Sequence, residues 1–150
     1  MATMIQSTIQ TPSPLQQALL ERIFSIPAVR QFGIVIDHLD NAECTARAPY
    51  IKEYTGSYQS FHGGMLAALA DTIACFAVMT RTAPDEILTT TDLHIRYLAA
   101  CLSDVTVKAK AIKVGRTLCP VQVELFDENG TMVAIAQVTY MRLPGLPNRA

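Results

Sequence analysis

The segment 65–80 constrains the fold more than any other part of this 150-residue chain. It reads MLAALADTIACFAVMT, and only Asp71, Thr72 and Thr80 interrupt its apolar run. Its alanine content and its length favour a helix over a strand. A helix that is apolar on every side has to be buried on nearly every side. Because the segment is too short, and too interrupted by Asp71, to span a membrane, we expect a curved sheet to wrap around it.

The strands for such a sheet lie on both sides of this helix in the sequence. An additional amphipathic helix is predicted at 14–24, where apolar residues recur every four positions and Pro27 ends the pattern. β-Rich composition bounded by turn residues predicts strands at 32–37, 44–49, 88–99, 105–114, 118–127 and 132–142. Short turns between successive strands make them antiparallel neighbours. The predicted class is therefore α+β, with an antiparallel sheet around one long central helix.

Composition indicates a single domain at 15–150, preceded by a flexible N-terminal tail at 1–14 that is rich in Thr, Ser, Gln and Pro. Half of the residues are hydrophobic and 17% are charged, and so apolar a domain often hides surface in an oligomer. The net charge of -1 argues against nucleic-acid binding, which depends on an excess of Lys and Arg.

The cysteines indicate neither a disulfide framework nor a zinc site. They are widely spaced without a CxxC pair, at Cys44, Cys75, Cys101 and Cys119. His38 and His94 are also isolated from them, so no metal site is expected. We expect free thiols in a reducing compartment. The N-terminus has neither the pattern of a signal peptide nor that of a transit peptide, and the predicted location is cytoplasmic.

Asp71 is the most informative residue for function. An ionised carboxylate in an apolar helix is costly to bury, so Asp71 needs a partner, a shifted pKa or a function. The glycine pair Gly63-Gly64 opens the same helix, where backbone N–H groups can approach a ligand and hold an oxyanion. Alternatively, Asp71 bonds a backbone amide or a hydroxyl such as that of Thr72, or the helix is wet on that side, and the glycines only form the turn.

Helix geometry limits how these two features could work together. Gly64 and Asp71 are seven residues apart, or about 10 Å along a helix. A reacting carbonyl has to lie about 3 Å from both its oxyanion donor and the attacking group. One helix therefore cannot supply both, whereas two antiparallel copies across a two-fold axis can. An active site built on these residues requires a dimer.

The segment around the HGG turn and Asp71 resembles that of a known family. The segment 58–77, YQSFHGGMLAALADTIACFA, resembles the signature of hotdog-fold acyl-CoA thioesterases of the phenylacetate-pathway (PaaI) type. In that family an HGG turn opens the central helix and an Asp follows nine residues after the His, as His62 and Asp71 do here. The segments TTTDLHIRYLAAC and VGRTLCPVQVELFDENGTMVAIAQVTYM also resemble the family's strands, so the likeness covers about residues 32–142.

The resemblance implies a hotdog fold, a homodimer that is often paired into a homotetramer, and hydrolysis of acyl-CoA at the dimer interface without a cofactor. It implies that Asp71 is the nucleophile or the general base. The Gly63 N–H would polarise the thioester carbonyl, His62 would position the turn, and Thr90 would assist Asp71. Substrate contacts are expected from the second glycine, from aromatic residues near the turn and from two basic residues: Gly64, Tyr58, Phe61, Arg116 and Lys113.

The sequence departs from the family at one position. Many relatives have an Asn six residues before the His of the HGG turn, and this chain has Gly56 there. Gln59 and Ser57 are the candidates to replace it. Two alternatives to a thioesterase stay open. One is a hotdog hydratase or dehydratase, which usually needs a His base in addition to the carboxylate. The other is a non-catalytic module that binds acyl-CoA.

Overall fold

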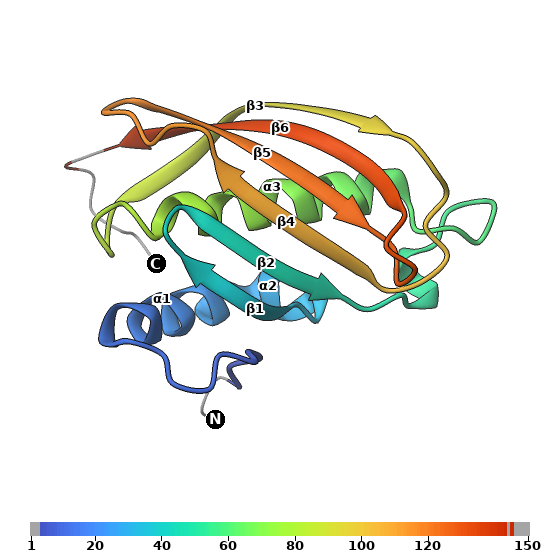
Figure 1. Cartoon of the computed structure of the whole chain (residues 1–150), viewed down its shortest axis with the longest axis horizontal. Coiled ribbons are helices and arrows are strands. Elements are labelled where there is room, and N and C mark those ends of the chain that lie inside the picture. The colour runs from blue at the N-terminus through green and yellow to red at the C-terminus, as the bar shows by residue number, and fades with distance from the viewer. Residues whose placement is uncertain (1–3, 144, 146–150) are drawn as a thin grey trace.

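The computed structural model describes residues 4–143 and 145. Six antiparallel strands form one sheet in the order β1-β2-β4-β5-β6-β3. The sheet curves around one long helix, α3 (Gly63–Met79), as Figure 1 shows. The predicted α+β class is confirmed. The strands are β1 (Val35–Asp40), β2 (Glu43–Ala48), β3 (Ile87–Tyr97), β4 (Val105–Ala111), β5 (Leu118–Phe126) and β6 (Met132–Leu143).

The central helix packs its apolar side chains against the concave face of the sheet. Its residues Leu66, Leu69, Ile73 and Phe76 are buried together with the inward-facing residues of the strands. Full burial of each such side chain contributes about 1.5–3 kcal/mol. One stripe of α3 is covered less completely, because Ala68, Asp71, Thr72 and Cys75 are only half-buried. In the single chain the predicted burial on nearly every side therefore leaves out one narrow face.

The N-terminal half contains a helix that the sequence did not indicate. α1 (Pro14–Ser25) agrees with the predicted helix, and a short second helix, α2 (Pro27–Phe32), follows it directly. The predicted strand at 32–37 was wrong at its beginning, because Phe32 ends α2 and β1 starts at Val35. Pro27 not only ends the first helix but also occupies the first turn of the second, where a missing N–H costs nothing. Gly33 then ends α2 with a φ of 65°, the left-handed conformation that glycine adopts readily.

The two edges of the sheet differ in how they are covered. Within the segment expected to be flexible, residues 6–8 hydrogen-bond to β1. Thr8 N–H donates to Ile36 C=O at 2.9 Å, and Ile36 N–H donates to Gln6 C=O at 3.0 Å. The segment therefore protects the edge at β1. At the opposite edge, no described segment pairs with the outer side of β3. Among the described residues, no helix has the length and hydropathy needed to span a membrane.

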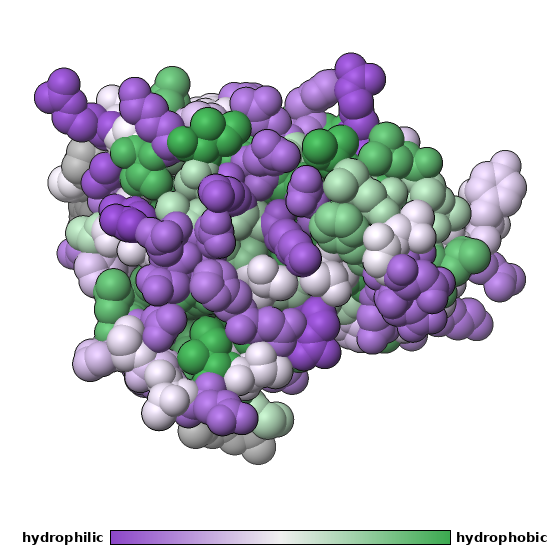
Figure 2. Space-filling model, in the orientation of Figure 1, coloured by the Kyte–Doolittle hydropathy of each residue, from purple (hydrophilic) through white to green (hydrophobic). Residues whose placement is uncertain are grey.

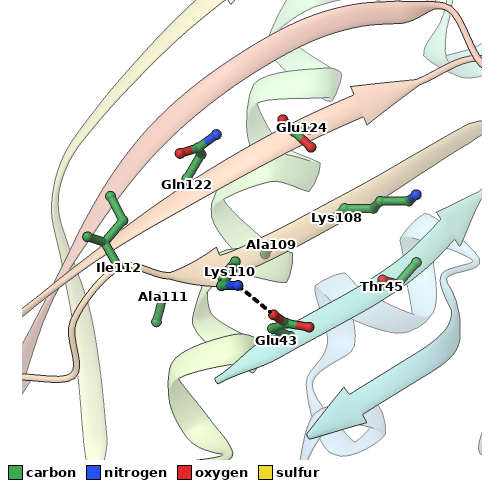
Figure 3. Close-up of a pocket in the computed structure, with 9 residues that line it drawn as sticks. All are labelled: Glu43, Thr45, Lys108, Ala109, Lys110, Ala111, Ile112, Gln122 and Glu124. Carbon is green, nitrogen blue, oxygen red and sulfur yellow. Dashed lines mark ion pairs between the residues drawn. The ribbon is translucent and has the colours of Figure 1, made fainter. Parts of the chain in front are cut away.

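The convex face of the sheet, away from α3, is polar. Figure 2 shows hydrophilic side chains across most of this face. A hollow on it is bordered by side chains from β2, β4 and β5 (Figure 3), including the ion pair between Lys110 and Glu43 at 3.1 Å. Lys108 lies beside this hollow with its ammonium 5.2 Å from the centre of the Phe126 ring. The sheet separates the hollow from α3, so the hollow and Asp71 lie on opposite faces.

Candidate active site

The HGG turn places one free backbone donor at the start of α3. His62 is the N-cap residue, and its Nδ1 accepts a hydrogen bond from the Gly64 N–H at 3.0 Å. Its carbonyl accepts from Met65 N–H and Leu66 N–H. The Gly63 N–H has no hydrogen-bond acceptor among the described residues. Of the two glycine donors considered from the sequence, Gly64 is therefore occupied by the cap and Gly63 is available to a ligand.

Tyr97 covers Gly63 from the end of β3. Its hydroxyl donates to the Gly63 carbonyl at 2.5 Å, and its side chain is half-exposed. A Cβ atom added to Gly63 would lie 3.1 Å from the nearest ring carbon of Tyr97. This contact is tighter than usual, so a Cβ at position 63 would displace the half-exposed Tyr97 ring by a few tenths of an ångström.

An open hollow without charged side chains lies beside Gly63. Its lining includes Phe61, Leu66, Leu98 and Cys101, and none of its lining residues carries a formal charge. Such a surface suits the acyl part of a substrate better than it suits phosphates. Phe61, which is buried, forms part of this lining.

Tyr58 and Gln59 lie on the loop before the turn and are not among the residues that line this hollow. Tyr58 is 90% exposed. Gln59 is exposed and has a φ of 57°, and its carbonyl accepts a hydrogen bond from the Tyr50 hydroxyl. Gly56 leaves room beside His62, because an added Cβ would contact the imidazole at 3.6 Å. Within one chain, neither Tyr58 nor Gln59 is brought next to Asp71.

Asp71 lies half-buried in the middle of α3 and is held by two hydroxyl groups. Thr90 Oγ1 donates to its Oδ1 at 2.8 Å. Tyr140 Oη lies 2.6 Å from the same Oδ1 and 2.5 Å from the main-chain carbonyl oxygen of Asp71. None of the ion pairs among the described residues includes Asp71. Hydroxyl groups rather than a cation therefore hold this carboxylate, and its Oδ2 has no described partner.

The groups next to Asp71 stay protonated. Burial raises the pKa of the Tyr140 hydroxyl, and the neighbouring Cys75 and Asp71 raise it further. Burial also raises the pKa of the Cys75 thiol to about 12. Tyr140 is therefore a neutral donor across the working range of pH, and Cys75 is not a thiolate nucleophile.

A β-bulge aligns the two parts of the site along β3. Thr90 and Tyr97 are seven positions apart, and in a regular strand such residues would point to opposite faces of the sheet. The register with β6 shifts between Thr90 and Asp92, which leaves one extra residue there. This bulge turns both side chains toward α3, where Thr90 contacts Asp71 and Tyr97 contacts Gly63.

The two basic residues proposed for the CoA phosphates lie at the other end of α3. Lys113 borders a hollow with Asn41, Arg81 and Arg142, just beyond the C-terminal end of the helix. Arg116 is exposed on the nearby connection between β4 and β5. A single chain therefore does not bring these side chains to Gly63. Among the described residues, no cluster of His, Cys, Asp and Glu is arranged to hold a metal.

An antiparallel sheet wrapped around one long helix, with a carboxylate midway along that helix, is the hotdog fold that the resemblance implied. Residues 58–134, half of the chain, match the thioesterase superfamily. The chain belongs to this superfamily.

Solved structures of other family members have the same fold. A thioesterase family protein from Silicibacter pomeroyi superposes with a TM-score of 0.81 at 20% identity, covering 87% of this chain and 99% of that one. The PaaI protein of the Escherichia coli phenylacetic acid degradation operon gives 0.79 at 20% identity, with coverages of 87% and 94%. A thioesterase from Haemophilus influenzae gives 0.78 at 22% identity, with coverages of 98% and 100%. A comparison with curated protein sequences gives no match.

Tyr140 was not identified from the sequence as a site residue. Its position on β6 follows the inward-facing alternation with Val138 and Ala136, which makes it look like an ordinary core residue. The one available signal was a side chain with a polar tip at an inward position of a strand. That signal does not say which group the hydroxyl binds.

Proposed function

We propose that this protein is an acyl-CoA thioesterase, which hydrolyses an acyl-CoA to the free acid and CoA. The observation that carries the proposal is the state of Asp71. Its carboxylate is held on one oxygen by two hydroxyls, its other oxygen has no described partner, and it lies in an otherwise apolar helix. A carboxylate kept unpaired from any cation in such a place fits a general base or a nucleophile better than a structural ion pair.

The chemistry requires two groups that act on one thioester carbonyl. As a general base, Asp71 takes a proton from a water molecule whose oxygen attacks the carbonyl carbon. As a nucleophile, Asp71 attacks the carbon itself, and water then hydrolyses the resulting anhydride. In either case the carbonyl oxygen becomes an oxyanion that the Gly63 N–H can stabilise, and the carbon–sulfur bond breaks to release CoA as the thiol.

A dimer brings these two groups together. Within one chain, Gly63 and Asp71 lie more than 10 Å apart along α3, by roughly 1.5 Å per residue. On β3, however, Thr90 contacts Asp71 and Tyr97 contacts Gly63. If the free edges of two β3 strands pair antiparallel about a two-fold axis at His94, the extra residue of the bulge places Thr90 of one chain beside the partner's Tyr97. Asp71 then lies near the partner's Gly63.

Two further features support this dimer. The half-buried stripe of α3 that contains Asp71 is covered when the two helices pack side by side. In the same arrangement the C-terminal end of each α3 extends past the partner's Gly63, toward the loop that contains Tyr58 and Gln59. Lys113 and Arg116 would then lie where the CoA phosphates of a bound substrate extend out of the site. A further pairing of dimers into a tetramer would leave this site unchanged.

The direct test is a turnover screen. The wild-type protein is assayed for thiol release with short-chain, long-chain and aromatic acyl-CoAs, and Asp71→Asn and Asp71→Ala are assayed in parallel. We expect hydrolysis of at least one class, a loss of about 100-fold or more in kcat for both variants, and an unchanged oligomeric state. Unchanged turnover in both variants would exclude the mechanism. Tight binding of acyl-CoA without thiol release would instead indicate a binding module, and hydration of an enoyl-CoA would indicate a hydratase.

A subunit-mixing experiment tests the shared site separately. Gly63→Pro removes the free N–H, and proline is tolerated at the first position of a helix, after an extended residue such as His62. Chains with Asp71→Asn and chains with Gly63→Pro are each expected to be inactive alone. Co-expressed in equal amounts, they form mixed dimers in which one of two sites is intact, so about one quarter of the wild-type activity returns. No recovery in confirmed mixed dimers would mean that each site lies within one chain.

A further inference from the structure

We propose that Tyr140 is a positioning residue of this site, which together with Thr90 fixes Oδ1 of Asp71 and thereby makes Oδ2 the reacting oxygen. This inference rests on the proposed thioesterase function. Two hydroxyls contact the same carboxylate oxygen, at 2.8 Å from Thr90 and 2.6 Å from Tyr140. An oxygen that already accepts two hydrogen bonds is both occupied and less basic than its neighbour. The proton or the acyl group therefore bonds to Oδ2.

Tyr140 also restricts the rotation of the Asp71 side chain. Its hydroxyl lies within hydrogen-bond distance of both Oδ1 and the main-chain carbonyl oxygen of Asp71. A contact with both the main chain and the carboxylate of one residue defines the direction in which that carboxylate points. Thr90 contacts only the carboxylate, so it cannot supply this restriction alone. Oδ2 is then presented on the half-buried stripe of α3, where a second chain would bring its Gly63.

The hydroxyls of Thr90 and Tyr140 reach Asp71 from neighbouring strands of the sheet. Thr90 and Tyr140 are direct cross-strand partners on β3 and β6, and the bulge begins immediately after Thr90. Tyr140 is only 4% exposed, whereas Thr90 is on the exposed edge strand. The phenol ring therefore has a rigid position in the core, and it carries its hydroxyl to Asp71 from the protected side of the site. Because Tyr140 stays protonated, its single hydroxyl proton remains available throughout the reaction to the two Asp71 oxygens that share it, Oδ1 and the main-chain carbonyl oxygen.

The expected effect is on the chemical step and not on substrate binding. Removing one hydrogen bond to a charged group should lower kcat by about 10- to 100-fold. KM should change by less than about two-fold, because the hydroxyl faces Asp71 and not the substrate. The acid limb of the pH–rate profile should move to higher pH, because the ionised carboxylate loses a donor that favours it.

The test compares Tyr140→Phe with Tyr54→Phe. Both changes remove a buried tyrosine hydroxyl that binds a main-chain carbonyl, but the Tyr54 hydroxyl binds the carbonyl of Gln31 on α2 and not Asp71. We expect the kcat loss and the shifted acid limb in Tyr140→Phe and neither in Tyr54→Phe, with similar thermal unfolding of the two variants. Equal kcat values and equal pH profiles in both variants would overturn the inference.

Two further variants keep the inference testable. If Tyr140→Phe does not fold, Thr90→Val removes the other donor to Oδ1 from an exposed position. An unchanged pH–rate profile in that variant would overturn the inference that hydroxyl donors fix Oδ1. Asp71→Asn distinguishes a failure of this inference from a failure of the proposed role of Asp71. If it is inactive while Tyr140→Phe behaves like wild type, the inference fails and the thioesterase proposal stands. If Asp71→Asn retains full turnover, the proposed catalytic role of Asp71 fails together with the inference, whereas no thiol release by the wild-type protein would refute the proposed function itself.

Discussion

His62 can be tested as a helix cap, independently of any role as a base. Its Nδ1 is joined to Cβ through one carbon atom, as Oδ1 of an asparagine is, so His62→Asn places an acceptor at nearly the same point. His62→Ala removes the acceptor, and His62→Gln moves it one bond further out. The bond to Gly64 N–H is 3.0 Å long and the imidazole is exposed. The loss should therefore be near the middle of the range for N-caps, about 1 kcal/mol, or roughly five-fold in the folding equilibrium.

The assay is urea unfolding of the three variants at pH 8, followed by turnover with whichever acyl-CoA the wild type hydrolyses. We expect Ala and Gln to lower the free energy of unfolding by about 1 kcal/mol and Asn to restore it. Turnover should follow the same order, because the cap fixes the turn that carries the Gly63 N–H. If His62→Asn is as unstable as His62→Ala, the prediction that His62 stabilises the helix as its N-cap is refuted. A stable but inactive Asn variant would show that the imidazole takes part in the chemistry, as a hydratase would require.

Three other expectations follow from the described residues. Arg142 binds Glu86 through two nitrogens, at 2.6 and 2.9 Å, and holds the pKa of Glu86 below its usual value of 4.5. This stabilisation is present above about pH 4.5 and is lost as the pH falls further, so Glu86→Gln should cost about 1–3 kcal/mol at pH 7 and less in acid, by urea unfolding. A loss of unfolding free energy in Glu86→Gln that does not change with pH would contradict this expectation. Gly115→Ala should cost about 1–3 kcal/mol in the same assay, because its Cβ would lie 2.5 Å from the Leu118 carbonyl oxygen; a stability equal to wild type would show that the turn can move. Because burial raises the pKa of Cys75 to about 12, iodoacetamide should label it slowly at pH 8, and rapid labelling by mass spectrometry would argue against this.

Much of the fold could be predicted from the sequence because its strongest signals are local. The apolar run at 65–80 defines α3 to within two residues at either end, and alternation defines most strands. The errors have physical causes. α2 has only six residues, too few for a hydrophobic period to develop, and Pro27 is compatible with both the end of one helix and the start of the next. The contact of residues 6–8 with β1 depends on main-chain hydrogen bonds, which do not require any particular side chain.

The candidate site could be predicted only where its signal is local. Asp71 and the HGG turn lie in one segment, and an Asp inside an apolar helix is visible without a structure. The hydroxyls that hold it come from positions 19 and 69 residues away. Thr90 was expected only through the family resemblance, and Tyr140 not at all. A carboxylate in an apolar helix signals that partners must exist, because the cost of burial has to be offset, but it does not say where in the chain they are.

The bulge after Thr90 is the feature that links the fold to the proposed chemistry. Without it, Thr90 would point to the convex face, and β3 could carry either the contact to Asp71 or the contact to Gly63 on its inner face, but not both. With it, one unpaired edge strand holds both halves of the site at a fixed separation. In the proposed dimer, two such edges would pair antiparallel, so that each Asp71 would face the partner's Gly63. One extra residue in β3 thus makes a dimer through this edge sufficient to assemble two complete sites, which is why the subunit-mixing experiment tests the strand's geometry as well as its chemistry.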